Sequence, residues 1–514
     1  MRQDSGGIMS EAQNTLVDAI VAAAADLDAI AIESSAQGRY SYHRFHGLIY
    51  RYAHALVSLG VRPGDRVAVQ VDKSVDAIAL YLATVASGAV FLPLNTAYTA
   101  REVAYFLQDA TPRLLVCDPA SSLPHHDAIT ELALSIRTLD AHGGGSLAAL
   151  AEVQPRVFKT VPRSGDDLAA ILYTSGTTGR SKGAMLSHNN LLSNARTLVD
   201  HWQFSESDVL IHTLPVYHTH GLFVATNVAL LANARMLFEP QFSVEAVLSH
   251  LPSATAMMGV PTHYVRLLQD QRLSASLTHN MRVFISGSAP LLEETFNAFH
   301  ARTGHCILER YGMTETSMSL SNPYSGERIA GTVGQPLPGL EARIVDIESQ
   351  EPSAVGEIGM LEVRGPHVFQ GYWQMPEKTA AEFRDDGFFI TGDLARCDER
   401  GYFSIVGRGK DLIISGGLNV YPKEVELCLD RLEGVVESAV VGVPHPDFGE
   451  AVVAVVVPAQ GVEIDESALG NALVDQLAKF KQPKRIITVS ELPRNTMGKV
   501  QKNVLREQYQ ALFA

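Results

Sequence analysis

The chain of 514 residues has little cysteine and no long apolar run. Its four cysteines, Cys117, Cys306, Cys397 and Cys428, lie far apart and form no CxxC or other zinc-like spacing. This pattern argues against a disulfide scaffold or a structural zinc site, and it is typical of reduced thiols in a cytoplasmic protein. No stretch reaches the roughly 20 apolar residues that a membrane-spanning helix needs.

Positive charge is also scarce. The chain has 41 Lys and Arg against 56 Asp and Glu, which gives a formal net charge of -15. Such a balance argues against broad binding of nucleic acid or of anionic membranes, although local cationic pockets can still hold small anions. Apolar residues make up 46% of the chain, enough for a substantial buried core. We therefore expect a globular protein whose partners are small molecules, and the sequence leaves its oligomeric state open.

Helical patterns alternate with short β-branched runs through the first two thirds of the chain. Residues 66–72, 89–95, 113–118 and 168–176 read as strands, and residues 76–88 read as a helix ended by glycine. Strands that alternate with helices of 10 to 15 residues indicate βαβ units and parallel sheets. The sequence thus predicts the α/β class for this part.

The pattern changes after about residue 335. Short β segments joined by Gly and Asp turns predict a small antiparallel sheet or barrel up to residue 408. The charged, glycine-rich stretch GRGKDLIISGGLNVYP follows, and a new helix–strand pattern runs from there to the end. We predict a domain boundary at Lys410, with an N-terminal domain at 1–409 and a C-terminal α+β domain at 410–514, which is large enough to fold by itself.

A loop suited to binding phosphate stands at residues 171–188, ILYTSGTTGRSKGAMLSH. An apolar strand leads into hydroxyl and glycine residues from Thr174 to Gly179, and Lys182 follows. Glycines let backbone N–H groups wrap around an anion, hydroxyls add donors, and the lysine adds charge. The loop lacks the GxxxxGK[ST] order of a P-loop, because the lysine is followed by glycine, so a P-loop ATPase is disfavoured.

The motif YTSGTTGRSKG resembles the signature of the adenylate-forming enzymes, which include acyl-CoA synthetases, luciferases and peptide-synthetase adenylation domains. Further motifs follow in that family's order over roughly residues 30 to 505: GSAPL (287–291), YGMTET (311–316), TGD (391–393), GRGKDLI (407–413) and PRNTMGK (493–499). The resemblance implies a large α/β N-terminal domain with a small barrel-like part and a mobile C-terminal domain. It also implies that a carboxylate attacks the ATP α-phosphate to give acyl-AMP, from which coenzyme A displaces AMP.

The resemblance also assigns roles to residues. Lys499 would bridge the carboxylate and the α-phosphate, Glu315 would ligate Mg²⁺ together with Thr178, and Tyr311 would stack on adenine. Asp393 would bind the ribose hydroxyls with Arg408 nearby, and Lys410 would be the hinge at which the small domain rotates. The positions expected to bind ATP or CoA are Thr174, Ser175, Gly176, Thr177, Thr178, Gly179, Lys182, Ser288, Ala289, Pro290, Glu309, Tyr311, Gly312, Met313, Thr314, Asp393, Arg408, Lys410, Gly416 and Gly417.

By the same resemblance the acid pocket draws on three segments: LPVYHTHGLF (214–223), MRVFISGS (281–288) and YGMTETSM (311–318). His218 is counted among the catalytic residues with Lys499 and Glu315. No histidine is assigned as a general base, because a carboxylate nucleophile is already ionised at neutral pH. The residues expected to contact the acid are His218, Thr219, His220, Arg282, Ser286, Arg310, Met313 and Met318.

Arg310 departs from the pattern of relatives that use long or aromatic acids, which usually carry glycine or alanine before the stacking tyrosine. A buried guanidinium needs an anionic partner, because burying it unpaired costs several kcal/mol. The partner is either Glu309 or another protein acid, or a second carboxylate on the substrate. The same arginine and its flanking segments resemble those of the malonate–CoA ligases as a group. For Arg282 a structural ion pair is the main alternative to substrate contact, and Arg266 is a weaker candidate.

Three other functions remain open. Methylmalonate differs from malonate by one methyl, which changes discrimination by only about 1–3 kcal/mol, and a short monoacid or an aryl acid would leave Arg310 unpaired. A loader of a separate carrier protein would transfer the acyl group without free CoA. A luciferase-like oxygenase or a nucleotide sensor is disfavoured, because Lys499 and Glu315 are both present.

Overall fold

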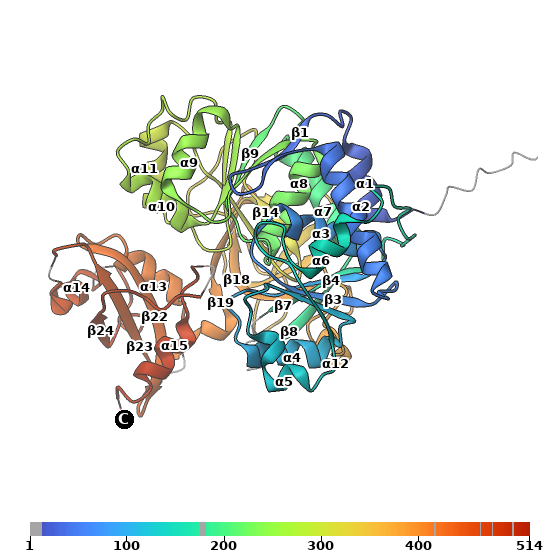
Figure 1. The fold of residues 1–514 in the computed structure, drawn as a ribbon. Coiled ribbons are helices and arrows are strands. Elements are labelled where there is room, and N and C mark those ends of the chain that lie inside the picture. Colours follow the sequence, from blue (N-terminus) through green and yellow to red (C-terminus); the bar gives the residue numbers. More distant parts are fainter. Residues whose placement is uncertain are drawn as a thin grey trace, which may run out of the picture.

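The computed structural model describes residues 13–174, 181–415, 418–462, 464–474, 476–495 and 498–513. Two large sheets, each mainly parallel, form the N-terminal portion (Figure 1). The nine-stranded sheet has the order β15-β14-β13-β12-β11-β9-β10-β1-β2, and the six-stranded sheet has the order β6-β5-β3-β4-β7-β8. Antiparallel pairing is confined to β2, β14 and β15 in the larger sheet and to β8 in the smaller one. The predicted α/β class with parallel sheets is confirmed.

Buried runs of β-branched and aliphatic residues make these strands, as expected for sheets that are covered on both faces. The nine-stranded sheet consists of β1 Ile30–Ser34, β2 Gly38–Ser41, β9 Val209–His212, β10 Arg235–Phe238, β11 Ala256–Gly259, β12 Val283–Ser286, β13 Leu308–Met313, β14 Ser317–Ser321 and β15 Gln335–Pro336. The six-stranded sheet consists of β3 Arg66–Gln70, β4 Val90–Pro93, β5 Leu114–Cys117, β6 Ser135–Thr138, β7 Leu168–Thr174 and β8 Lys182–Ser187.

Helices form three layers around the two sheets (Figure 1). The middle layer shares one core with both sheets, and the two outer layers each make a separate core. The middle layer holds α1 Thr15–Ala23, α2 Tyr42–Ser58, α3 Val75–Ala86, α6 Ser146–Glu152, α7 His188–His201 and α8 Thr226–Leu231. The outer layers hold α9 Val244–His250, α10 Pro261–Gln269 and α11 Glu293–Thr303 on one side, and α4 Ala100–Ala110, α5 Asp127–Thr130 and α12 Pro376–Ala381 on the other.

The remaining elements form two smaller sheets. A four-stranded antiparallel sheet, predicted from the short β segments after residue 335, has the order β16-β17-β18-β19. In the C-terminal part β24 joins the path β21-β20-β23-β22, with its own cores. Their bounds are β16 Glu341–Val345, β17 Gly359–Arg364, β18 Phe389–Cys397, β19 Phe403–Arg408, β20 Ile413–Ser415, β21 Leu418–Val420, α13 Pro422–Leu429, β22 Val435–His445, β23 Gly449–Pro458, α14 Glu466–Ala472, β24 Arg485–Thr488 and α15 Lys502–Tyr509.

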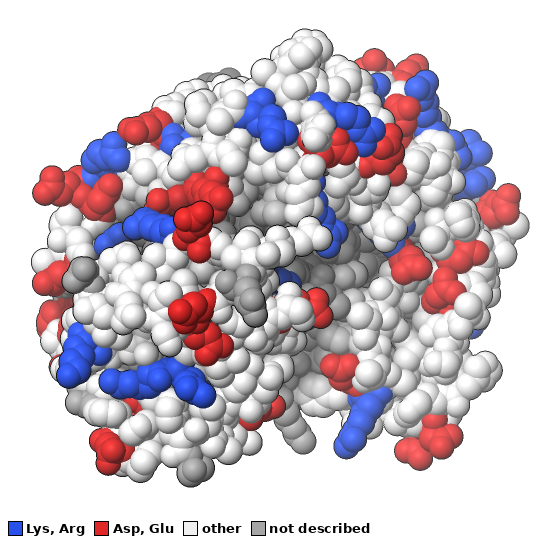
Figure 2. Space-filling view, turned by 90° about the vertical axis from the view of Figure 1, so that its left-hand side faces the viewer, with Lys and Arg blue, Asp and Glu red and all other residues white. Residues whose placement is uncertain are grey.

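The large N-terminal and small C-terminal domains are confirmed as the architecture, and the single turn η4 Gly409–Asp411 connects β19 to β20. The exact boundary at Lys410 stays a prediction. Among the described residues, no helix is both long and apolar enough to cross a membrane. On the face shown in Figure 2, lysine and arginine lie among aspartate and glutamate, and the surface is hollowed near its middle.

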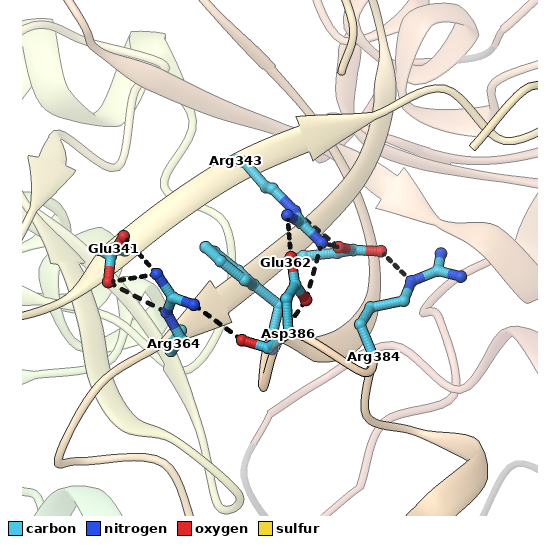
Figure 3. A network of polar contacts seen from close by, with 7 residues as sticks. Glu341, Arg343, Glu362, Arg364, Arg384 and Asp386 are labelled. Atoms are coloured by element: carbon cyan, nitrogen blue, oxygen red, sulfur yellow. Dashed lines mark hydrogen bonds and ion pairs between the residues drawn. The ribbon is translucent and has the colours of Figure 1, made fainter. Parts of the chain in front are cut away.

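A buried ion-pair network supports the segment that leads into β18 (Figure 3). Glu362 on β17 has no exposed surface, and its two carboxylate oxygens are held by Arg343 at 2.8 Å and by Arg384 at 2.7 Å. Arg343 also reaches Asp386 at 2.6 Å. The network therefore connects the edge of the four-stranded sheet to the loop before β18.

Glu362→Ala should lower the thermal unfolding midpoint strongly. It removes the fully buried carboxylate that Arg343 and Arg384 share and leaves Arg343 with Asp386 alone, and breaking a buried ion pair costs about 3–5 kcal/mol. Glu341→Ala is the matched control, because Glu341 makes a solvent-exposed pair with Arg364 at 2.8 Å in the same sheet. Calorimetry at one scan rate measures both variants, and equal shifts would contradict the role assigned to Glu362.

Candidate active site

The predicted site residues come from elements that converge at the carboxyl ends of parallel strands. β9, β11, β12 and β13 are parallel neighbours in the nine-stranded sheet, so the residues that follow them lie together beyond the carboxyl ends of the strands. Ligands of open α/β sheets bind at these carboxyl ends. The structure thus brings together the segments at 214–223, 286–290 and 308–318, which are far apart in the sequence.

The start and end of the phosphate loop are described, whereas Ser175, Gly176, Thr177, Thr178 and Gly179 lie outside the described residues. Thr174 ends β7 and pairs across the hairpin with Lys182, which begins β8. The Lys182 ammonium lies 3.1 Å from Glu382 and 3.9 Å from the ring centroid of Tyr372. Thr174 Oγ1 lies 3.5 Å from Glu315 Oε1, so the first end of the loop contacts the predicted metal ligand.

Glu315 belongs to a small polar cluster that the sequence reasoning did not include. The Tyr372 hydroxyl lies 3.0 Å from Glu315 Oε1 and 2.6 Å from Glu382 Oε2. Burial raises the pKa of Glu315. Tyr372 and Glu382 were missed because they are 57 and 67 residues from Glu315 in the chain, and nothing in the local sequence GYWQMPEKTAAEF signals the contact.

The predicted adenosine side is built around Tyr311 on β13. The Tyr311 hydroxyl donates to Asp393 on β18 at 2.6 Å, and Arg408 on β19 approaches the other oxygen of Asp393 at 3.3 Å. A side chain at Gly312 would overlap the Ser317 carbonyl oxygen, so this tight turn needs glycine. Asp393 therefore contacts both Tyr311 and Arg408, and all three belong to the positions predicted to bind ATP. Of the other predicted positions, Ser288, Ala289, Met313 and Thr314 are half-buried nearby in the chain, and Pro290 is exposed.

Arg310 is buried with 3% of its surface exposed, and its Nε and Nη2 atoms find no hydrogen-bond partner among the described residues. Glu309 does not pair with it, because neighbouring strand residues point to opposite faces. The Glu309 carboxylate instead accepts a hydrogen bond from the Leu291 amide at 2.9 Å, and burial raises its pKa to about 8. Burial also lowers the pKa of Arg310 to about 9. A guanidinium with free donors therefore stands in the predicted acid pocket.

Glycine makes room for this guanidinium. Gly287 follows β12, and a Cβ atom there would lie 2.6 Å from Arg310 Nε, too close for two nonbonded atoms. Sequence reasoning missed this role, although the GSAPL motif begins at that glycine.

Neutral polar groups surround Arg310. Burial, together with the charges of Arg310 and Lys499, lowers the pKa of His218 to about 4. The pKa of His220 is also lowered by burial and by Arg310, and its Nδ1 lies 3.2 Å from Ser288 Oγ. His220 Nε2, Thr219 Oγ1 and Ser286 Oγ are buried without partners among the described residues. The pocket thus offers several free hydrogen-bonding groups beside one cation, and Met318 is buried close by at the Gly312 turn.

The C-terminal domain places Lys499 in the same region. Burial and the neighbouring Arg408 guanidinium lower the pKa of Lys499 to about 8, and its own charge acts on His218. A Cβ atom at Gly498 would lie 3.7 Å from Thr262 Oγ1, so the loop that carries the lysine contacts α10 of the N-terminal domain. Lys410 is exposed in η4, and Gly416 and Gly417 lie outside the described residues.

Arg282 requires a correction. It stands before β12, at the amino end of the strand, and four residues at about 3.3 Å each separate it from Ser286 at the carboxyl end. Its guanidinium pairs with both oxygens of Asp208, at 2.6 and 2.8 Å. The pair with Asp208 therefore favours the structural ion pair, the alternative that the sequence left open for Arg282, over a substrate contact. Arg266 is exposed on α10.

The family models of the AMP-binding enzymes match residues 20–373, and those of the AMP-binding enzyme C-terminal domain match residues 424–499. The chain belongs to the AMP-binding enzyme family. It is 35% identical to the malonate–CoA ligase of Arabidopsis thaliana, over 87% of this chain and 78% of that protein. It is also 35% identical to the sulfoacetate–CoA ligase of Cupriavidus necator, over 86% of this chain and 87% of that protein.

Solved structures extend this likeness. MatB from Rhodopseudomonas palustris is 56% identical, and the match covers 98% of this chain and all of that one. The TM-score is 0.95 against ATP-bound MatB and 0.84 against apo MatB at the same identity and coverage. The arrangement of this chain is thus more similar to that of the ATP-bound form, which agrees with the burial of Lys499 between the domains.

Proposed function

We propose that the protein ligates malonate to coenzyme A, forming malonyl-AMP and pyrophosphate from ATP and then malonyl-CoA and AMP. The observation that supports malonate as the acid is the state of Arg310, which is buried with free donors and pairs with no carboxylate of the described residues. A guanidinium binds a carboxylate through two parallel hydrogen bonds, so the second carboxylate of a short diacid would fill this need. The likeness to a malonate–CoA ligase supports the same reading.

The proposed roles follow the geometry of the described residues. Tyr311 and Asp393 would hold adenine and ribose, Lys182 would bind the β- and γ-phosphates, and Arg310 would fix the far carboxylate of malonate. The near carboxylate would then face the α-phosphate, where Lys499 would neutralise the charge that develops on the transferring oxygens. No base is required in this step, because the attacking carboxylate is already ionised.

The residues around Glu315 fit a magnesium ion. Mg²⁺ in nucleotide sites is held by one or two carboxylates together with phosphate oxygens and water, and Glu315 offers such a carboxylate beside Thr174. When bound, the ion would neutralise charge on the phosphates. The separate domain at 410–514 with Lys410 as its hinge, CoA contact at Gly416 and Gly417, and a cytoplasmic location are parts of the same proposal, the last supported by four free cysteines.

A second dianionic substrate is a specific alternative. The sulfonate of sulfoacetate would also bind an unpaired guanidinium, and one relative carries that activity in its name. Methylmalonate differs by one methyl only, a difference of about 1–3 kcal/mol.

Product mass spectrometry with ATP, Mg²⁺ and CoA tests the proposal. The panel holds malonate, methylmalonate, sulfoacetate, succinate, acetate, octanoate and coumarate. We expect malonyl-CoA to form with the highest kcat/KM. A preference for acetate or a longer monoacid would overturn the assignment of the acid, and a thioester formed only on a carrier protein would overturn CoA as the acceptor.

A further inference from the structure

Lys73 is a buried lysine that the proposed reaction does not use. It follows β3, has 9% of its surface exposed and forms no ion pair with the carboxylates that the structure describes. Its ammonium lies 4.3 Å from the ring centroid of Phe238, and burial lowers its pKa well below the usual range. The Glu239 carboxylate acts on Lys73 through its charge but makes no ion pair with it. Burying an ammonium without such a pair costs stability, so its contacts call for an explanation.

The hydrogen-bond contacts of Lys73 are with a buried histidine, His212. Lys73 Nζ lies 3.1 Å from His212 Nδ1 and 2.8 Å from the His212 carbonyl oxygen. The other ring nitrogen of His212, Nε2, lies 3.0 Å from the carbonyl oxygen of Gly221. Because a carbonyl can only accept, Nε2 carries the proton, and Nδ1 of the neutral ring accepts from Lys73.

The carbonyl at the end of this chain belongs to an unusual helix. The segment His220–Ala225 is a π-helix, in which the Thr226 amide bonds back to the Gly221 carbonyl, and Thr226 Oγ1 donates to the same oxygen at 2.9 Å. π-helical turns are rare and are frequently found at functional sites. A side chain at Gly221 would overlap the Pro215 carbonyl, so the turn is held tightly. Gly221 directly follows His220, whose free Nε2 lies in the pocket with Arg310.

We propose that Lys73 and His212 are positioning residues for the acid site. The hydrogen-bond chain from Lys73 Nζ through the His212 ring to the Gly221 carbonyl fixes the first turn of the π-helix, and it thereby sets the place of His220 relative to Arg310. The inference rests on the proposed function for the identity of the acid. The adenine and ribose residues, Tyr311 and Asp393, lie on β13 and β18 outside this chain of contacts, so nucleotide binding should not depend on it.

Lys73→Met tests the inference, because methionine keeps the volume and the packing over Phe238 but donates no hydrogen bond. We expect KM for malonate to rise about tenfold or more, since displacing a substrate-contacting group by a fraction of an ångström is costly, while KM for ATP stays within about twofold. The thermal midpoint should be unchanged or higher, because an apolar residue replaces a buried ammonium. Tyr81→Phe is the matched control: the Tyr81 hydroxyl contacts Asn227 on α8 at 3.3 Å but not Gly221.

Equal rises in KM for malonate and ATP, or a malonate KM like that of Tyr81→Phe, would overturn the inference. Thr226→Val is a second variant that removes another donor to the Gly221 carbonyl, and it should shift the same KM in the same direction if Lys73→Met fails to fold. A failure of the proposed function can be told apart from a failure of this inference, because it changes which acid the wild type prefers. If another acid is the better substrate, the same split is measured with that acid.

Discussion

Lys499→Ala should abolish formation of malonyl-AMP and leave the transfer of malonyl from preformed malonyl-AMP to CoA largely intact. The lysine is the C-terminal domain's cation beside His218, and in the proposed reaction it offsets charge that appears only as the α-phosphate is attacked. Removing one such group typically lowers the rate by about a hundredfold to a thousandfold. Pyrophosphate release reports the first half-reaction, and thioester formation from synthetic malonyl-AMP reports the second.

Lys479→Ala is the control for this comparison, because Lys479 is an exposed lysine of the same domain. It should leave the adenylation rate within about twofold of the wild type. Equal losses in both half-reactions of Lys499→Ala would show that the lysine supports the folded domain or CoA binding, and would reject the role in adenylation.

The sequence predicts the residues of the proposed nucleotide side from short motifs whose order is specific. Tyr311, Asp393 and Arg408 come from three motifs, and the structure brings Asp393 into contact with the other two. The strand and helix pattern likewise predicted the parallel sheets, since a buried strand leaves a recognisable run of β-branched residues.

Contacts between distant segments were not predictable in the same way. Arg282 was predicted near the acid as part of the segment 281–288, but only the fold shows that the two ends of β12 are separate environments. Tyr372 and Glu382 reach Glu315 from a loop without any motif. The sequence assigned no role to Gly287, and only the guanidinium beside it shows why a side chain is excluded there.

Arg310→Gly should remove the preference for malonate. A charge-paired, buried hydrogen-bonding group typically contributes about 2–5 kcal/mol to binding its partner, so kcat/KM for malonate should fall by about thirtyfold or more. Acetate, which has no second carboxylate, should lose little, and octanoate should gain because the floor of the pocket is opened. Competition between acids, read out by mass spectrometry of the CoA thioesters, measures the change in selectivity directly.

Two further substitutions test whether the position or the charge of the Arg310 guanidinium determines the preference for malonate. Gly287→Ala retains Arg310 but forces its guanidinium to move, because the new methyl would lie 2.6 Å from Nε. It should raise KM for malonate by about tenfold without opening the pocket to octanoate. Arg282→Met removes a partly buried arginine from the other end of β12, where Asp208 neutralises it, and should leave the ratio of malonate to acetate unchanged. If Arg310→Gly also left the ratio of malonate to acetate unchanged, Arg310 would be a structural cation. The unpaired donors in the pocket would then have to be explained by adenylation of some other acid.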